Sequence, residues 1–126
     1  MRIEIGELKM KENIIKNKSF DFALRIVKLY QYLIEFKKEF VLSKQLLRSG
    51  TAIGALVREA EQAESKADFI HKLSISLKEA NESEYWIELL FKANYFEAKQ
   101  YQSINTDLQE ILKLLVSIIK TSKSQK

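Results

Sequence analysis

The fold is decided by residues 51–90, TAIGALVREAEQAESKADFIHKLSISLKEANESEYWIELL. Apolar residues recur at helical spacing on both sides of Ser65, which is the pattern of two amphipathic helices. Ser65 is followed three residues later by Asp68, an arrangement that resembles a capping box with Asp in place of the usual Glu or Gln. The stretch therefore predicts the end of one long helix, a tight connection and most of a second long helix.

The composition favours long helices joined by few connections. The chain has 126 residues, 46% of them hydrophobic, with no Pro and only three Gly. Since Pro and Gly punctuate sheets and turns, their scarcity favours helices, and this length is enough for one domain with a single core. The predicted helices span residues 19–36, 41–64, 66–95 and 105–121. We therefore predict an all-α fold, an antiparallel up-down-up-down four-helix bundle over residues 19–121, with a basic N-terminal tail at 1–18 and a polar C-terminal tail at 122–126.

The first predicted helix, which opens at Ser19 as its N-cap, has apolar side chains on two faces. One stripe is predicted to face the core: Phe20, Ala23, Val27, Tyr30 and Ile34, flanked by Ile26 and Leu33. A second stripe of Phe22, Leu29 and Phe36 lies on roughly the opposite face. Because a monomer needs only one such stripe, the second predicts a self-association face. Scattered apolar surface residues are the alternative.

The other helices add to this pattern. The predicted core positions are Leu42, Leu46, Ile53, Val57 and Ala60 in the second helix, Phe69, Leu73, Ser76, Ala80, Ile87 and Phe91 in the third, and Leu108, Ile111, Leu112, Leu115, Ile118 and Ile119 in the fourth. Gly50 and Gly54 predict a close approach between two helices. In the third helix, Ile75, Trp86 and Leu90 lie to one side of the core stripe, and they complete the candidate oligomer interface.

The formal net charge of +4 permits a nucleic-acid partner but does not require one. The best-ordered basic residues, Lys44, Arg48 and Arg58, are predicted on the outer face of the second helix. They are the candidate contacts to RNA or DNA phosphates, and a solvated helix face is the alternative. The lysines of residues 1–18 offer either a further phosphate contact or a solvated terminus.

Residue types that carry catalysis or bind metals are scarce. The chain has no Cys, its single His is His71, and it lacks the Glu-x-x-His motif of carboxylate-bridged di-metal bundles. We therefore predict no catalytic residue, metal, cofactor or small-molecule substrate, and we expect a protein that is not an enzyme. The one enzymatic alternative is a site formed between subunits around Asp68, His71 and Glu84. With no signal-peptide pattern and no run of about 18 apolar residues, a cytoplasmic protein without a membrane partner is expected.

The central sequence resembles a known family at a series of spaced positions. These are Gln45, Leu46 and Arg48, then Ile53, Val57 and Glu59, then Ser65, Asp68 and Phe69, and finally Glu79. The chain is similar to the small four-helix-bundle proteins encoded in intervening sequences of bacterial large-subunit ribosomal RNA genes. The resemblance covers residues 20–121. The chain departs from the family pattern at Ala52, Leu56 and Ala60, where the family has Ser, Asn and Gly.

The resemblance implies a homo-oligomer, typically a pentameric ring, with no assigned catalytic residue. Relatives that accompany diversity-generating retroelements form basic rings that bind the reverse transcriptase and nucleic acid. Our first hypothesis is therefore a non-enzymatic, homo-oligomeric bundle that acts as an accessory factor for RNA or a nucleoprotein through phosphate contacts. The alternative is a protein–protein interaction scaffold with no nucleic-acid role.

Overall fold

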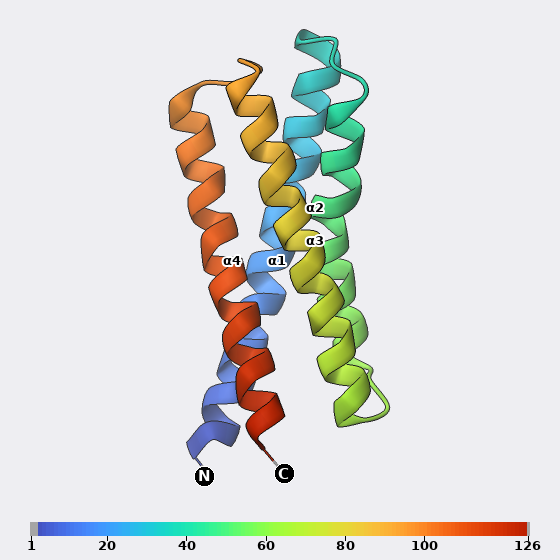
Figure 1. Ribbon diagram of the computed structural model, residues 1–126, viewed down its shortest axis with the longest axis vertical. Helices are drawn as coiled ribbons and strands as arrows, with labels where there is room; N and C mark the ends of the chain where they lie inside the picture. The colour runs from blue at the N-terminus through green and yellow to red at the C-terminus, as the bar shows by residue number, and fades with distance from the viewer. Residues whose placement is uncertain (1–2, 126) are drawn as a thin grey trace.

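The computed structural model describes residues 3–125. They form four helices: α1 (Ile3–Phe36), α2 (Leu42–Glu61), α3 (Lys66–Lys92) and α4 (Ala98–Ser124). The helices alternate in direction, so the α1–α2 and α3–α4 connections lie at one end and the α2–α3 connection lies with both termini at the other (Figure 1). Each helix packs against the next, and α1 also packs against α4. The predicted all-α, up-down-up-down bundle is confirmed, and the described residues contain no strand.

The first helix begins well before the predicted position. Since α1 starts at Ile3, the prediction of a loosely held tail over residues 1–18 is wrong from Ile3 onward, and residues 1–2 lie outside the described part of the chain. Ser19, the predicted N-cap, lies in the middle of α1, where its buried hydroxyl donates to a backbone carbonyl one turn earlier. The extension is held because Ile15 is buried in the core.

The last helix is longer than predicted at both ends. Because α4 spans Ala98–Ser124, most of the stretch between the predicted helices 66–95 and 105–121 is helix, and so is the tail predicted at 122–126 as far as Ser124. A capping box starts α4: the side chains of Glu97 and Gln100 each accept a hydrogen bond from the other residue's backbone N–H. Glu is outside the group of preferred N-cap residues, which is why the sequence pattern misplaces this start.

The features predicted around the central connection are confirmed. Ser65 is the N-cap of α3, and its Oγ accepts a hydrogen bond from the backbone N–H of Asp68 at 3.0 Å. Gly50 and Gly54 do allow a close approach between helices: a Cβ at Gly54 would lie 3.2 Å from the backbone oxygen of Ser19. The two helices can therefore pack at a short distance because Gly50 and Gly54 have no side chains.

The core-facing side of α1 lies between the two predicted apolar stripes, closer to the second stripe than to the first. Phe22 of the second stripe is in the core at 1% exposure, whereas Phe20 of the first stripe is 47% exposed. Of the residues predicted in the core with Phe20, Ile26 and Leu33 are buried, and a further four are only half-buried: Ala23, Val27, Tyr30 and Ile34. Because both stripes are strongly apolar, periodicity shows that α1 has two such faces but not which one points inward.

The core of the other helices follows most of the predicted positions. Buried residues include Leu46, Ile53, Val57 and Ala60 in α2, Leu73, Ser76, Ala80 and Ile87 in α3, and Leu108, Ile111, Leu115, Ile118 and Ile119 in α4. Small polar residues fill the seam between α2 and α3, where the hydroxyls of Ser49 and Ser83 lie 2.9 Å apart. Over the described residues, no helix combines the length and apolar character needed to cross a membrane.

Candidate functional site

Arg48, one of the three predicted nucleic-acid contacts, is exposed but paired with carboxylates of its own chain. Its Nη2 lies 2.6 Å from Oε2 of Glu82 and 3.1 Å from Oε1 of Glu79, both on α3. The indole Nε1 of Trp86 donates to the same oxygen of Glu82 at 2.9 Å. The bond from Trp86, followed by the one from Arg48, lowers the pKa of Glu82. The charge of Arg48 therefore serves to join α2 to α3.

The other two predicted contacts lie in different surroundings. The guanidinium of Arg58 lies over the ring of Phe20, with Cζ 5.0 Å from the ring centroid, which is a cation–π contact. Lys44 is exposed, and it forms no ion pair with any side chain that the structure describes. All three predicted residues are exposed on α2, as expected, but their partners differ. Of the three, Arg48 is held by carboxylates of α3, whereas Lys44 and Arg58 form no ion pair with the described residues.

A shallow apolar groove, which we call the α1–α2 groove, lies between those helices on the outside of the bundle. It has a volume of about 240 Å³ and is lined by Phe20, Ala23, Thr51, Gly54, Ala55 and Arg58. Leu24, one turn from Phe20 and also exposed, extends its apolar edge. The first apolar stripe of α1 is predicted to face the core. Part of it, at Phe20, is therefore exposed to solvent instead.

The six apolar side chains predicted at an oligomer interface do not share one surface. Phe22 and Leu90 are fully buried in the core of a single chain, so their assignment to an interface is wrong. The half-buried members are Leu29, Ile75 and Trp86. Phe36 is exposed at the end of α1. The exposed apolar surface that the predicted interface requires is present instead at the α1–α2 groove.

Two exposed apolar residues near Phe36 escape the helical patterns altogether. Phe40 and Val41 belong to the connection between α1 and α2, and both are exposed. The signal that could have found them is the hexapeptide FKKEFV at residues 36–41, which places three large apolar side chains around a predicted connection. We call residues 36–41 the α1–α2 tip.

The residues of the enzymatic alternative do not come together within one chain. His71 is exposed, and the carboxylate of Asp68 accepts the backbone N–H of Glu64 at 3.4 Å. Glu84 lies about 20 Å farther along α3 by the helix rise, and it accepts a hydrogen bond from the side chain of Gln109. Over residues 3–125, no three or more His, Cys, Asp or Glu side chains are grouped so that they could hold a metal ion.

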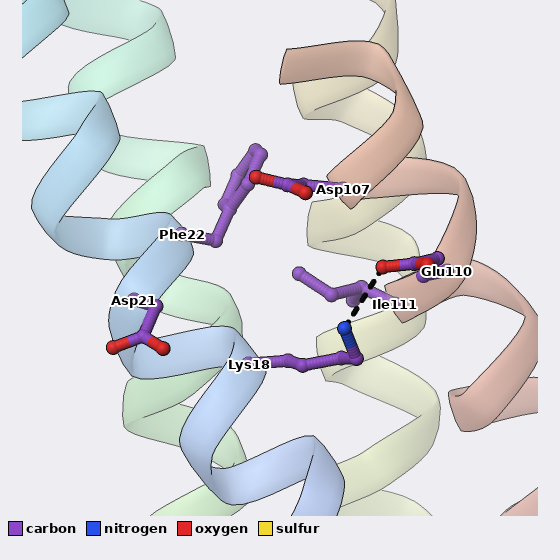
Figure 2. Close-up of a pocket in the computed structure, with 6 residues that line it drawn as sticks. All are labelled: Lys18, Asp21, Phe22, Asp107, Glu110 and Ile111. Atoms are coloured by element: carbon purple, nitrogen blue, oxygen red, sulfur yellow. Dashed lines mark hydrogen bonds and ion pairs between the residues drawn. The ribbon is translucent and has the colours of Figure 1, made fainter. Parts of the chain in front are cut away.

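A recess between α1 and α4 is small and lined by charges that pair across it. Figure 2 shows Lys18 and Glu110 facing each other, with Nζ 2.8 Å from Oε1. Arg25 donates to Asp107 at 2.7 Å along the same seam. The recess has a volume of about 110 Å³, and Phe22 lines its core side. Lys18 and Glu110 are paired with each other and Asp107 is paired with Arg25, so these residues join α1 to α4 across the recess.

Comparison with known proteins places the chain among helical proteins of one family. The family model described as 23S rRNA-intervening sequence protein matches residues 11–117. A solved crystal structure, of a protein of unknown function from the S23 ribosomal protein family of Bacteroides thetaiotaomicron, is 64% identical in sequence, with a TM-score of 0.86. The alignment covers 87% of this chain and 98% of that one. No curated protein matches the chain.

Proposed function

The chain belongs to the family of 23S rRNA-intervening sequence proteins, and from this premise we propose that it is a non-enzymatic, homo-oligomeric helical bundle. It acts in the cytoplasm as an accessory factor that binds RNA or a nucleoprotein. The observation that carries the proposal is the α1–α2 groove, because a single bundle leaves Phe20 and Leu24 exposed there.

The occupant that we propose for the α1–α2 groove is a second copy of the chain. Small residues at Ala23, Gly54 and Ala55 let another helix approach closely. A different surface with exposed apolar character lies on α4, lined by Leu112, Lys113, Val116, Ser117 and Lys120. A contact between two different surfaces is heterologous, and such contacts close into a ring when the rotation allows it. This supports the pentameric ring that the family resemblance implies.

The RNA part of the proposal is supported by the sign and distribution of charge. Each chain carries a formal net charge of +4, so a ring multiplies this excess and attracts phosphates over long distances. No acidic residue follows Glu110 in the sequence, so every charged residue in the second half of α4 is a lysine. Phosphate contacts of this kind give binding that is salt-sensitive and only weakly sequence-specific.

The assembly is tested by light scattering on a sizing column. The wild-type protein is expected to elute as one closed oligomer, and the Ala55→Lys variant as a monomer, because the interface would bury an ammonium group beside the like charge of Arg58. Gln45→Lys is the matched control, since it adds the same charge at another exposed position of α2 outside the groove. A monomeric wild-type protein would contradict the proposal.

The RNA part is tested by repeating the measurement with generic RNA at low and high salt. An oligomer that shifts with RNA only at low salt supports the accessory-factor function, because counterion release weakens phosphate contacts as salt rises. An oligomer that ignores RNA under both conditions favours the alternative function, a protein–protein interaction scaffold. The ratio of absorbance at 260 and 280 nm of the purified protein gives an independent reading of bound nucleic acid.

A further inference from the structure

The α1–α2 tip exposes more apolar surface than any requirement of folding explains. Phe36, Phe40 and Val41 are 68%, 56% and 70% exposed. Lys37 and Lys38, between the two rings in the sequence, are exposed as well. The tip lies at the end of the bundle opposite the two termini, at the top of the view in Figure 1. Aromatic and basic side chains are thus exposed together at one end of the molecule.

The backbone of the tip is held in place by a buried carboxylate. Glu39 is only 8% exposed, and its two oxygens accept the backbone N–H groups of Val41, Leu42 and Ser43 at 3.2, 3.0 and 2.6 Å. The hydroxyl of Ser43 donates back to the carbonyl oxygen of Glu39 at 2.7 Å. Glu39 therefore caps the first turn of α2. These bonds also fix the backbone conformation at Phe40 and Val41.

Lys38 adopts a backbone conformation that residues other than Gly rarely take. Its φ is 54°, in the left-handed region that costs an L residue steric energy. The residues on either side are tied to the end of α1, because the N–H groups of Lys37 and Glu39 both donate to the carbonyl oxygen of Leu33, at 3.2 and 3.0 Å. The tip therefore keeps a lysine at a position where glycine would be conformationally easier.

The charges that the tip presents to solvent have one sign. Between residues 36 and 48 the only acidic residue is Glu39, whose carboxylate is buried against backbone N–H groups. Lys44, on the first turns of α2, adds a third exposed lysine. The ring of Phe36 packs against the ring of Tyr32, with ring centroids 5.7 Å apart. Exposed rings flanked by ammonium groups match the two components of a nucleic acid, its bases and its phosphates.

We propose that the α1–α2 tip binds single-stranded RNA, with Phe36 and Phe40 stacking on bases while Lys37, Lys38 and Lys44 contact phosphates. The inference rests on the RNA part of the proposed function and names the site that carries it. A protein partner is less suited to this surface, because a stable protein interface takes about 20–30 residues from each side and the tip is a segment of only residues 36–41. Bases, in contrast, stack on one ring at a time and only when they are unpaired.

Assembly would strengthen this binding. In a ring, each chain contributes one tip, so that a single RNA strand can meet several tips in succession. The second contact is then intramolecular, which raises the overall affinity without any new kind of contact. The tip is well separated from the α1–α2 groove, which lies along the helices, so contacts between copies leave the rings accessible.

Fluorescence anisotropy with a labelled oligouridine and with an RNA duplex of the same length tests the site. The Phe40→Ala variant is expected to bind the oligouridine about tenfold more weakly, as the loss of one base–aromatic stack predicts. Tyr85→Ala is the matched control, because Tyr85 is another exposed aromatic residue, on α3, and this change should leave the affinity unaltered. The duplex should bind more weakly than the single strand.

The lysines are tested separately through the dependence on salt. Lys38→Asn keeps a residue that tolerates the left-handed conformation and removes one ammonium group, so the slope of log affinity against log salt should become shallower by about 0.7, the value for one phosphate of a single strand. If Phe40→Ala and Lys38→Asn bind RNA as the wild type does, the tip is not the site, although the protein still binds RNA. If the wild type binds neither RNA, the proposed RNA function fails and this inference fails with it. Equal affinity for strand and duplex would overturn base stacking as the mechanism.

Discussion

Gly50 of α2 lies so close to Ile26 of α1 that a Cβ at position 50 would stand 2.8 Å from Cγ1 of Ile26. Because Ile26 is fully buried, its side chain cannot move aside without disturbing the core. Gly50→Ala should therefore cost about 1–3 kcal/mol through overpacking. This loss is offset in part by up to about 1 kcal/mol from the better helix propensity of Ala. Urea unfolding followed by circular dichroism measures the net decrease in the free energy of unfolding.

Gly6 provides the matched control for this prediction. It lies within α1, and a Cβ at this position would meet no atom within 4 Å. Only helix propensity remains, so Gly6→Ala should raise the free energy of unfolding, by up to about 1 kcal/mol. If both substitutions stabilised the protein, the close approach of α1 and α2 at Gly50 would be contradicted.

The cap at Ser65 gives a second prediction for stability. Its Oγ satisfies the backbone N–H of Asp68, which has no partner within the helix. Ser65→Ala should lower the free energy of unfolding by about 1 kcal/mol, whereas Ser65→Asp should largely preserve it because Asp is an equally good N-cap. The same urea titration compares the two variants. An equal loss in both would mean that the hydroxyl does not act as a cap.

The fold could be predicted wherever one local signal was sufficient. The Ser65 cap and the lack of Pro fix the central connection and the fold class without any tertiary information. The prediction failed where signals of equal strength compete. Phe20 and Phe22 are the same residue type on different faces of α1, and only the packing of α2 and α4 against α1 decides that Phe22 is buried. At Glu97 the signal is present but takes an unusual form.

The candidate site was harder to predict because its contacts join distant parts of the sequence. Helical spacing correctly places Arg48 on the exposed side of α2, yet it carries no information about Glu79 and Glu82, the residues of α3 that neutralise it. The tip has the opposite difficulty. Its sequence contains Glu39 among lysines, and only the structure shows that this carboxylate is buried and leaves the surface positive.

Arg48 and Lys44 should therefore differ in what their removal affects. Arg48→Ala should lower the free energy of unfolding by up to about 1 kcal/mol, because the ion pairs to Glu79 and Glu82 are partly exposed and screened. It should change RNA affinity by less than about twofold, whereas Lys44→Ala should weaken RNA binding and reduce its salt dependence. Urea unfolding and anisotropy, measured on both variants, separate the two roles. An equal decrease of RNA affinity in both would restore the shared basic patch.

Glu39 should make the stability of the protein depend on pH. Burial alone raises the pKa of Glu39, but the hydrogen bonds from the backbone of Ser43, Leu42 and Val41 outweigh burial and lower the pKa below 4.5. A folded-state pKa below the unfolded value means that the carboxylate stabilises the protein above the unfolded pKa, and that this contribution is lost as the pH falls through the folded pKa. Urea unfolding at pH 7 and pH 3 should therefore show a smaller difference for Glu39→Gln than for the wild type. Glu35→Gln is the control, because it changes an exposed carboxylate on the last turn of α1; it should show the same difference in the free energy of unfolding between pH 7 and pH 3 as the wild type. If Glu39→Gln also showed the wild-type difference, the carboxylate of Glu39 would not hold the tip through its charge.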